Sequence, residues 1–144
     1  MPVKVKKITL WRKELENHAG TLSETLEPLA KAGADLQVVM GYCFPGERSR
    51  AAVELFPVAL KKITAAAQSA GLSSSGIPAV HVEGDNRAGL GHSITRALAD
   101  AGVNLDFLVA HVVGRKFSAV FGFENDTDAA KAVSLIKKAS ARKK

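Results

Sequence analysis

Residues 16–36 of this chain read ENHAGTLSETLEPLAKAGADL and residues 85–105 read DNRAGLGHSITRALADAGVNL, so one stretch of sequence occurs twice. A constant offset of 69 residues aligns the two with eight identities in 21 positions. Such a fixed internal period is the mark of a repeated structural unit. The chain of 144 residues is therefore predicted to contain two copies of one module. The identical pairs are Asn17/Asn86, Ala19/Ala88, Gly20/Gly89, Leu29/Leu98, Ala30/Ala99, Ala32/Ala101, Gly33/Gly102 and Leu36/Leu105.

Each copy predicts the same elements, in the order strand, helix, strand, strand, helix. Alternating apolar and polar residues indicate the first strand, and apolar residues at helical spacing indicate the helix after it. Gly33 and Gly102 end these helices, because glycine adopts the left-handed cap conformation at little cost. The strands are predicted at 3–12, 35–43 and 50–56, and at 78–84, 104–113 and 117–124. The closing helices are predicted at about 57–70 and 127–139, with Asp126 or Thr127 as the N-cap of the last one.

This order of elements predicts an α+β fold of two ferredoxin-like modules, with antiparallel sheets and helices on one face. The first module is predicted at 1–72 and the second at 73–144. A linking strand at about 72–83, bent between Gly76 and Pro78, would end one module and begin the other. A full βαββαβ module needs a strand after its second helix, and the sequence ends too soon to supply it. The second module is therefore predicted to lack its last strand, leaving a sheet edge open or paired with another chain.

The strands at 105–113 and 117–123 are apolar on both faces. Leu105, Phe107 and Val109 are predicted to point one way, and Leu108, Ala110 and Val112 the other. Helices cover only one face of such a sheet, so a second sheet or a second subunit is needed to cover the other. We therefore expect sheet-to-sheet packing or a homodimer.

Composition and charge narrow the classes of function. Hydrophobic residues make up 47% of the chain and charged residues 24%, as in a folded globular protein. A single cysteine, Cys43, excludes an internal disulfide framework. Because the sequence has neither a membrane-length apolar run nor the profile of a secretory signal, a cytoplasmic location is predicted, with no membrane partner.

The net charge of +6 resides at the two ends of the chain. Residues 4–13 hold five basic groups and residues 137–144 hold five more, whereas residues 14–136 hold ten basic and 14 acidic groups. Affinity for a phosphate backbone requires cations clustered on one surface. A nucleic-acid partner is therefore not expected.

Catalytic patterns are weak. The four histidines (His18, His81, His92 and His111) lie in unrelated settings, and no nucleophile–base set or metal-ligand spacing is found. His111 is predicted to be a core residue of its strand and Cys43 a buried, inert thiol. The stretch from Gly84 to Gly91 has neither a phosphate-loop lysine nor the dinucleotide spacing. The chain is therefore predicted not to be an enzyme and to carry no metal and no cofactor.

The segment from Val82 to Leu90, VEGDNRAGL, and the later AGVNL at 101–105 resemble the ACT domain, the ferredoxin-like regulatory module of enzymes of amino-acid metabolism. The first copy resembles it through ENHAG at 16–20 and AGADL at 32–36. The resemblance covers most of the chain and implies a stand-alone tandem ACT protein. Alanine replaces the usual turn proline in both copies, and Gly84 replaces a histidine often found in serine sensors, so the resemblance does not name the ligand.

The resemblance implies an amino-acid site. In serine-sensing ACT domains the ligand is held by the turn asparagine and by the asparagine that opens the next strand. Backbone N–H groups at a helix start suit a carboxylate, and side-chain oxygens suit an ammonium group. His18 and Arg87 hold equivalent turn positions that could face an anion, and Asp35 would favour a more cationic ligand. The predicted ligand-binding residues are Asn86, Arg87, Ala88, Gly89, Leu90 and Asn104 in the second copy, and Asn17, His18, Gly20 and Asp35 in the first.

The predicted function is a regulatory, non-catalytic protein that binds a small molecule, most simply an amino acid, between modules or subunits. Ligand binding would change the assembly or its contact with a regulated enzyme or transporter. One alternative is a protein–protein adaptor with a vestigial site. Another is an RNA-binding module that stacks bases on Phe117, Phe121 and Phe123. A small enzyme on the same fold is a third, because fold does not fix function.

Overall fold

The computed structural model describes residues 3–141 of the chain and divides into two compact units. One unit is formed by Thr9–Gly76, and we call it the first module. The other combines the N-terminal stretch up to Ile8 with everything from Ile77 onward, and we call it the second module. The first module is thus inserted into the second, a division that differs from the predicted one at residues 72 and 73. No helix within residues 3–141 is long and apolar enough to cross a membrane.

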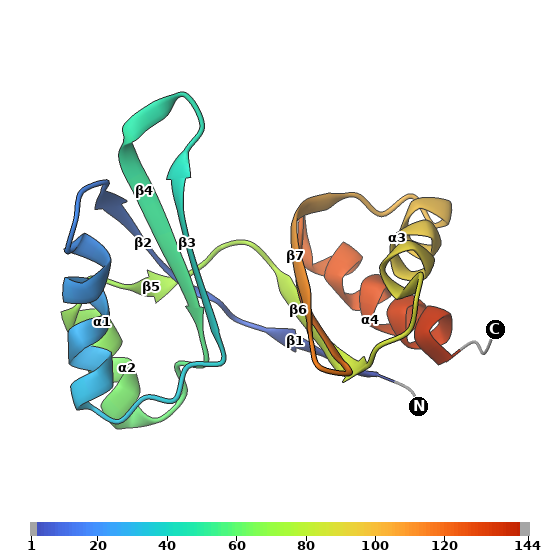
Figure 1. Ribbon diagram of the computed structural model, residues 1–144, viewed down its shortest axis with the longest axis horizontal. Coiled ribbons are helices and arrows are strands. Elements are labelled where there is room, and N and C mark those ends of the chain that lie inside the picture. The colour runs from blue at the N-terminus through green and yellow to red at the C-terminus, as the bar shows by residue number, and fades with distance from the viewer. Residues whose placement is uncertain (1–2, 142–144) are drawn as a thin grey trace. The chain divides into compact units, whose positions relative to one another are not determined.

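The first module is a four-stranded antiparallel sheet with two helices on one face (Figure 1). Its strands lie in the order β3-β4-β2-β5, so the strand pairs are not all consecutive in sequence. The fourth strand, β5, contains only two residues. The elements are β2 (Trp11–Glu16), α1 (Thr21–Lys31), β3 (Val38–Phe44), β4 (Glu47–Phe56), α2 (Lys61–Ser69) and β5 (Ser73–Ser74).

The second module has the same architecture, with helices α3 and α4 on one face of the sheet (Figure 1). Its strand order is β1-β6-β8-β7. Strands β7, β8, β6 and β1 of this sheet therefore occupy the places of β3, β4, β2 and β5 in the first sheet. The elements are β1 (Lys4–Ile8), β6 (Ala79–Asp85), α3 (Leu90–Asp100), β7 (Leu105–Val113), β8 (Lys116–Phe123) and α4 (Asp126–Ala141).

Strand β1 occupies the place of the missing last strand of the second module. No strand follows α4 in the described residues, as predicted, and β1 pairs with β6 at the sheet edge where β5 pairs with β2 in the first module. The prediction of one strand at 3–12 is wrong, because residues 4–8 and 11–16 are two strands in two different sheets. Alternating hydrophobicity cannot reveal this break, because the pattern continues through both strands.

The stretch at 72–83, predicted to link the modules, contains parts of two strands. It contributes β5 to the first sheet and β6 to the second, with an interruption at residues 75–78. Where the chain leaves the first module, the backbone N–H of Ser75 donates to the carbonyl of Leu10, at 2.7 Å. Trp11 and Ser74 are partners in the ladder beside this bond. The entry and exit of the first module therefore lie side by side.

Both modules bury a core between sheet and helices. Ile63 and Ala67 of α2 are buried, and the residues 69 positions later in α4, Ala132 and Ile136, are buried as well. The large and the small side chain have changed places, so the two cores use different residues to fill equivalent space. Volume-conserving exchanges of this kind are the ones that cores tolerate best.

The pairing of β7 with β8 defines the two faces of the second sheet. Val109 lies opposite Val120 on the open face, whereas Leu108 lies opposite the buried Phe121 on the helix side. The register shifts between Leu105 and Phe107, so these two residues do not share a face as predicted. Because β7 is the outermost strand, apolar side chains remain exposed along it: Leu108, Val109, Val112 and Val113.

The last helix begins one residue earlier than predicted and is capped differently. Its first residue is Asp126, and the side-chain oxygen of Asn125 accepts a hydrogen bond from the backbone N–H of Asp128, at 2.8 Å. Asn125 therefore serves as the N-cap in place of Asp126 or Thr127. Of the basic C-terminal group predicted at 137–144, residues 142–144 lie outside the described residues.

Replacing Gly122 by alanine is expected to destabilise the second module. A Cβ at this position on the open face would collide with the ring of Phe107. The ring must then move from its place, at a cost of about 1–3 kcal/mol in unfolding free energy. Urea denaturation of Gly122→Ala measures this cost. Gly91→Ala, where nothing lies within 4 Å of the added Cβ, is the matched control.

A double variant makes this expectation specific. If the collision with Phe107 is the cause, adding Phe107→Ala to Gly122→Ala removes it, so the two costs do not add. Strictly additive costs in the double-mutant cycle would show that the Phe107 ring is not the obstacle.

Candidate functional site

The turn before α1 holds the predicted residues of the first copy, and it is tied to the neighbouring hairpin. The backbone N–H of Asn17 donates to the carbonyl of Ser49 at 2.9 Å, and its side-chain amide donates to the carbonyl of Arg48 at 2.7 Å. Gly20, with φ of 93°, has the left-handed conformation that side chains disfavour. The turn is therefore held in one conformation, and the side-chain oxygen of Asn17 is left to accept a further hydrogen bond.

The turn before α3 is built in the same way. The backbone N–H of Asn86 donates to the carbonyl of Arg115 at 2.8 Å, and Gly89 has a φ of 82°. Within residues 3–141, no hydrogen bond is found for the side-chain amide of Asn86. Arg87 is turned toward the end of α4, where its guanidinium donates to the carbonyl of Ala139 at 3.3 Å. Leu90, predicted to border the ligand, is 2% exposed and packs in the core.

Asn104 lies at the far end of α3 from Asn86. Asn86 precedes the helix and Asn104 follows it, and the helix contains 11 residues. At 1.5 Å per residue the helix is about 16 Å long, which is more than one amino acid spans. The same separation divides Asn17 from Asp35 across α1, which also has 11 residues. A single module therefore does not bring its two predicted polar groups together.

A pocket of about 290 Å³ opens beside the first-copy turn. The His18 ring contacts the hydroxyl of Thr21 there, with 3.1 Å between Nδ1 and Oγ1. The same hydroxyl donates to the backbone carbonyl of His18 at 2.9 Å. The pocket thus combines polar groups at the start of α1 with apolar surface from α1 and β3. Its lining includes Asn17, His18, Thr21, Leu22, Gly41 and Cys43.

Several residues of this pocket were not predicted. Leu22 is 38% exposed although it lies on the apolar side of the helical pattern, and Cys43 is partly exposed, which contradicts the prediction of a buried thiol. Gly41 lies close to Leu22, since a Cβ added to this glycine would be 3.6 Å from Cδ2 of Leu22. Thr21, in place of Leu90 of the second copy, is the sequence difference that signals a more polar site in the first copy.

The prediction that His111 is a core residue is wrong, and another histidine, His81, is the buried one. His111, predicted to lie in the core, is exposed because β7 is the outermost strand of its sheet. His81, in contrast, is 5% exposed because β6 lies between β1 and β8. Burial lowers the pKa of His81 below its usual value of 6.5; the nearby Glu83 carboxylate opposes this change, and Lys6 adds to it.

The stability of the protein is expected to fall on acidification because of His81. A histidine with a lowered pKa in the folded state binds its proton more readily in the unfolded chain. Its stabilising contribution is therefore present above a pH of about 6.5 and is lost as pH falls through the lower pKa of the folded state. Thermal melting between about pH 7.5 and pH 5 should show a smaller fall for His81→Gln than for the unmodified chain. His111→Gln, on the exposed edge strand, should leave the fall unchanged; equal behaviour of both variants would contradict the assignment.

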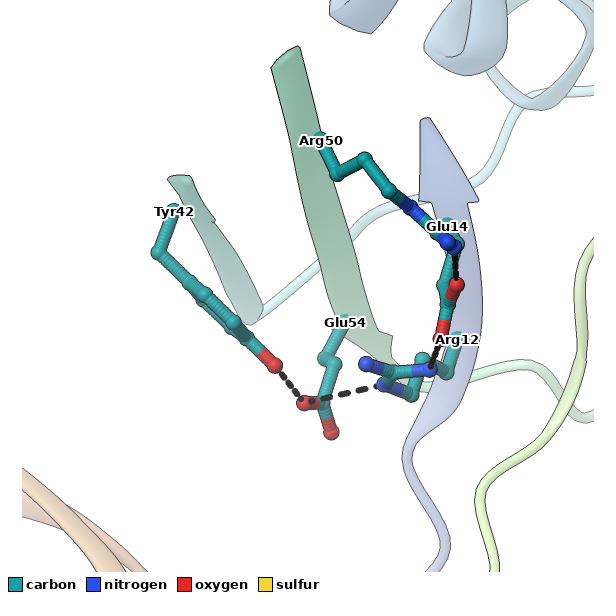
Figure 2. A network of polar contacts seen from close by, with 5 residues as sticks. All are labelled: Arg12, Glu14, Tyr42, Arg50 and Glu54. Atoms are coloured by element: carbon teal, nitrogen blue, oxygen red, sulfur yellow. Dashed lines mark hydrogen bonds and ion pairs between the residues drawn. The ribbon is translucent and has the colours of Figure 1, made fainter. Parts of the chain in front are cut away.

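The open face of the first sheet carries a chain of polar contacts (Figure 2). The Tyr42 hydroxyl donates to Oε2 of Glu54 at 2.8 Å, and Nε of Arg12 lies 3.7 Å from the same oxygen. Arg12 also contacts Glu14, at 3.0 Å, and Glu14 in turn pairs with Arg50. Two guanidinium groups thus face two carboxylates, so the network carries no excess charge.

Glu54 is the buried member of this network. Its side chain is 2% exposed, and Oε1 has no hydrogen-bond partner among the described residues. Burial and the adjacent Glu54 carboxylate raise the pKa of Tyr42 above 10.0, although Arg12 opposes this change. The network therefore keeps the Tyr42 hydroxyl protonated as the donor to Glu54. Nothing in it has the form of a catalytic set, and residues 3–141 contain no group of three or more candidate metal ligands.

The RNA-binding alternative required exposed aromatic rings on the central strands. Phe117, Phe121 and Phe123 are 5%, 1% and 0% exposed, and all three belong to the core between sheet and helices. Rings in this position are not available to stack on bases. The three phenylalanines are core residues.

No protein-family model matches this sequence, and a comparison with curated protein sequences finds no match either. Solved structures do match. Protein BT0572 from Bacteroides thetaiotaomicron has a TM-score of 0.71 at 18% identity, over 90% of this chain and 88% of that one. The ligand-free regulatory subunit of aspartate kinase from Thermus thermophilus has a TM-score of 0.62 at 13% identity, over 96% of this chain and 97% of that one.

The chain also matches part of a longer protein, an aspartate kinase. The enzyme from Clostridium acetobutylicum has a TM-score of 0.60 at 15% identity, over 96% of this chain and 34% of the enzyme. The match thus covers nearly all of the Thermus thermophilus chain and about a third of the Clostridium acetobutylicum enzyme. The prediction of two ferredoxin-like modules in tandem is confirmed.

Proposed function

We propose that this chain, which shares its fold end to end with a regulatory subunit of aspartate kinase, is a regulatory protein that binds an amino acid and has no catalytic activity of its own. The observation that carries the proposal is that the two modules together match a regulatory subunit over 96% of this chain and 97% of that one. The pocket beside Asn17 and His18 supports it, because it offers polar groups at a helix start for the charged ends of an amino acid.

The proposed ligand site of the second module lies between two copies of the chain. Asn86 and Asn104 are at opposite ends of α3, so one amino acid contacts both only if each comes from a different copy. Edge strand β7 supports this arrangement, because Leu108, Val109, Val112 and Val113 are exposed along it. Two β7 strands that pair antiparallel about a two-fold axis bring the start of α3 in one copy to the end of α3 in the other.

The individual residues have distinct roles in this proposal. Backbone N–H groups from Arg87 to Gly89 face the ligand carboxylate at the helix start, whereas the N–H of Leu90 donates to the carbonyl of Arg87. Gly89 allows the main chain to approach the ligand closely. The side chains of Asn86 and of the partner's Asn104 receive the ammonium group. In the first module, Asn17, His18 and Gly20 of one chain form one side of the proposed site. Asp35 of the partner subunit forms the other side, in the place of the second asparagine. A ligand that holds this dimer together shifts the balance of assemblies, which a regulated enzyme or transporter senses.

The test is a thermal-shift screen of the twenty amino acids against the intact chain. A ligand at a hundredfold excess over its dissociation constant adds about 2.7 kcal/mol to the stability. The stabilisation should be lost in Asn86→Ala and in Asn104→Ala if the second module binds, and in Asn17→Ala if the first does. No shift with any amino acid would contradict the proposal.

Mixed dimers test whether the site is shared. Asn86→Ala and Asn104→Ala are each expected to remove binding when studied alone. A dimer that combines one copy of each variant regains one complete site, because the intact Asn86 of one faces the intact Asn104 of the other. After the two variants are unfolded and refolded together, ligand binding should therefore return. Failure to return, with mixed dimers present, would place both asparagines in separate sites.

A further inference from the structure

A second cavity lies in the second module, between α3 and α4, away from the open face of the sheet. Its volume is about 400 Å³, within the range of small-molecule sites. Ala97, Leu135 and Ala139 give it an apolar floor, and His92, Ser93 and Lys138 contribute polar groups to its lining. Arg96 and Asp100 complete the lining. An apolar floor with a few convergent polar groups is the usual form of a ligand site.

The cavity has an excess of positive charge. Asp100, its one acidic residue, is already paired with Arg96, with 2.9 Å between Oδ1 and Nε. This pairing lowers the pKa of Asp100 and raises that of Arg96, so both remain charged and neutralise each other. Lys138 has no acidic partner anywhere in residues 3–141, and neither does His92. The charge available to a ligand is therefore the ammonium group of Lys138, and the His92 ring adds a polar group to the lining.

The repeat shows that the fold does not require these residues. At the offset of 69, Arg96 corresponds to Glu27 and Lys138 to Ser69 of the first module. His92 corresponds to Ser23. Both modules nevertheless pack their helices on a sheet of the same strand order. The cationic lining is thus a property of the second module alone, added to a shared framework.

We propose that the cavity between α3 and α4 binds a small organic anion. The acidic group lies against Lys138, His92 and the hydroxyl of Ser93, and an apolar body rests on Ala97, Leu135 and Ala139. The pairing of Arg96 with Asp100 neutralises those two side chains and leaves Lys138 to attract the ligand. This site is separate from the proposed amino-acid site, because it uses none of the turn residues and lies within one module.

The experiment is an NMR titration of the intact chain with phenyl phosphate, benzoate and inorganic phosphate. Saturable shifts are expected at His92, Ser93 and Lys138, with phenyl phosphate or benzoate binding several-fold more tightly than inorganic phosphate because each has an apolar body. Lys138→Ser, which installs the residue of the first module, should weaken binding about tenfold, as expected when a charged hydrogen-bond partner is removed. Lys137→Ser is the matched control, since this exposed lysine is adjacent on α4 but does not line the cavity.

Three results would overturn the proposal. Equal weakening in Lys137→Ser and Lys138→Ser would show general attraction to the basic end of the chain. Inorganic phosphate binding as tightly as both organic probes would show that the apolar floor has no role. No saturable binding of either organic probe, with unchanged melting curves for the chain, would show that the cavity has no affinity for anions of this kind. The amino-acid screen is unaffected by any of these results, so the two proposals can fail separately.

Discussion

Removing residues 1–8 is expected to unfold the second module and to leave the first module folded. Strand β1 and the residue before it belong to the second module, and Val3, Val5 and Ile8 are buried at 7%, 8% and 9% exposure. Each such side chain contributes about 1.5–3 kcal/mol when fully buried. Their joint loss is on the order of 5 kcal/mol, comparable with the whole stability of a small domain. The edge of β6 also loses its hydrogen-bonded partner.

The measurement is a two-dimensional amide NMR spectrum of the shortened chain. Signals from β6, β7 and β8 should collapse toward unfolded positions, while those of the first module remain dispersed. The single tryptophan, Trp11, belongs to the first module and should keep its native fluorescence. Dispersed signals from the whole of the second sheet would contradict the expectation.

A point variant in the intact chain gives a milder version of this test. Val5→Ser places a hydroxyl in the core of the second module, whereas Lys4→Ser places the same residue on the exposed side of the same strand. The first should lower the stability of the second module by about 2–3 kcal/mol, and the second by less than about 0.5 kcal/mol. Equal effects would show that β1 is not held by its buried side.

Replacing Phe121 by alanine is expected to cost about 3–5 kcal/mol of stability, as for other buried phenylalanines. Phe121 is 1% exposed in the middle of β8 and packs with the helices of the second module. Its ring lies 6.5 Å from that of Phe123, so a cavity left by the substitution opens into the centre of the core. Urea denaturation should show a lower midpoint, measured with the first module's tryptophan signal as an internal reference.

The matched control is Val109→Ala on the neighbouring strand. Val109 is 42% exposed on the open face, so its truncation should change stability by about 0.5 kcal/mol or less. If Phe121→Ala were tolerated as well as Val109→Ala, the ring would not be the core residue that the structure describes. The two variants thus distinguish the helix side of the sheet from its open side.

Much of this fold was predictable because the sequence contains two copies of one module. The repeat at a spacing of 69 predicted equivalent modules, and glycines such as Gly33 and Gly102 marked the ends of their first helices correctly. What could not be predicted was that β1, which precedes the first module in sequence, belongs to the sheet of the second module. Residues 4–8 and 11–16 have the same alternating pattern, and only long-range pairing with β6 or β4 decides which sheet each strand enters.

The candidate site was less predictable than the fold. The turns before the first helix of each module were predictable, because glycine occurs where φ is positive, as at Gly20 and Gly89. The predicted order of elements places Asn86 before a helix and Asn104 after it, but the sequence does not show what would bring the two asparagines to one ligand. It also could not distinguish the exposed His111 from the buried His81, because both occur in strands and only the position of the strand in the sheet separates them.

The adjacent entry and exit of the first module have a consequence for the order of folding. Pairing β1 with β6 joins residues such as Ile8 and Ala79, and closing a flexible loop of about 70 residues has a length-dependent entropy cost of about 4 kcal/mol. Once the first module has folded, the bond between Ser75 and Leu10 already holds the two ends of that loop together. We therefore expect the first module to fold early and to act as a preformed turn, after which β1 meets β6 as two arms of a hairpin.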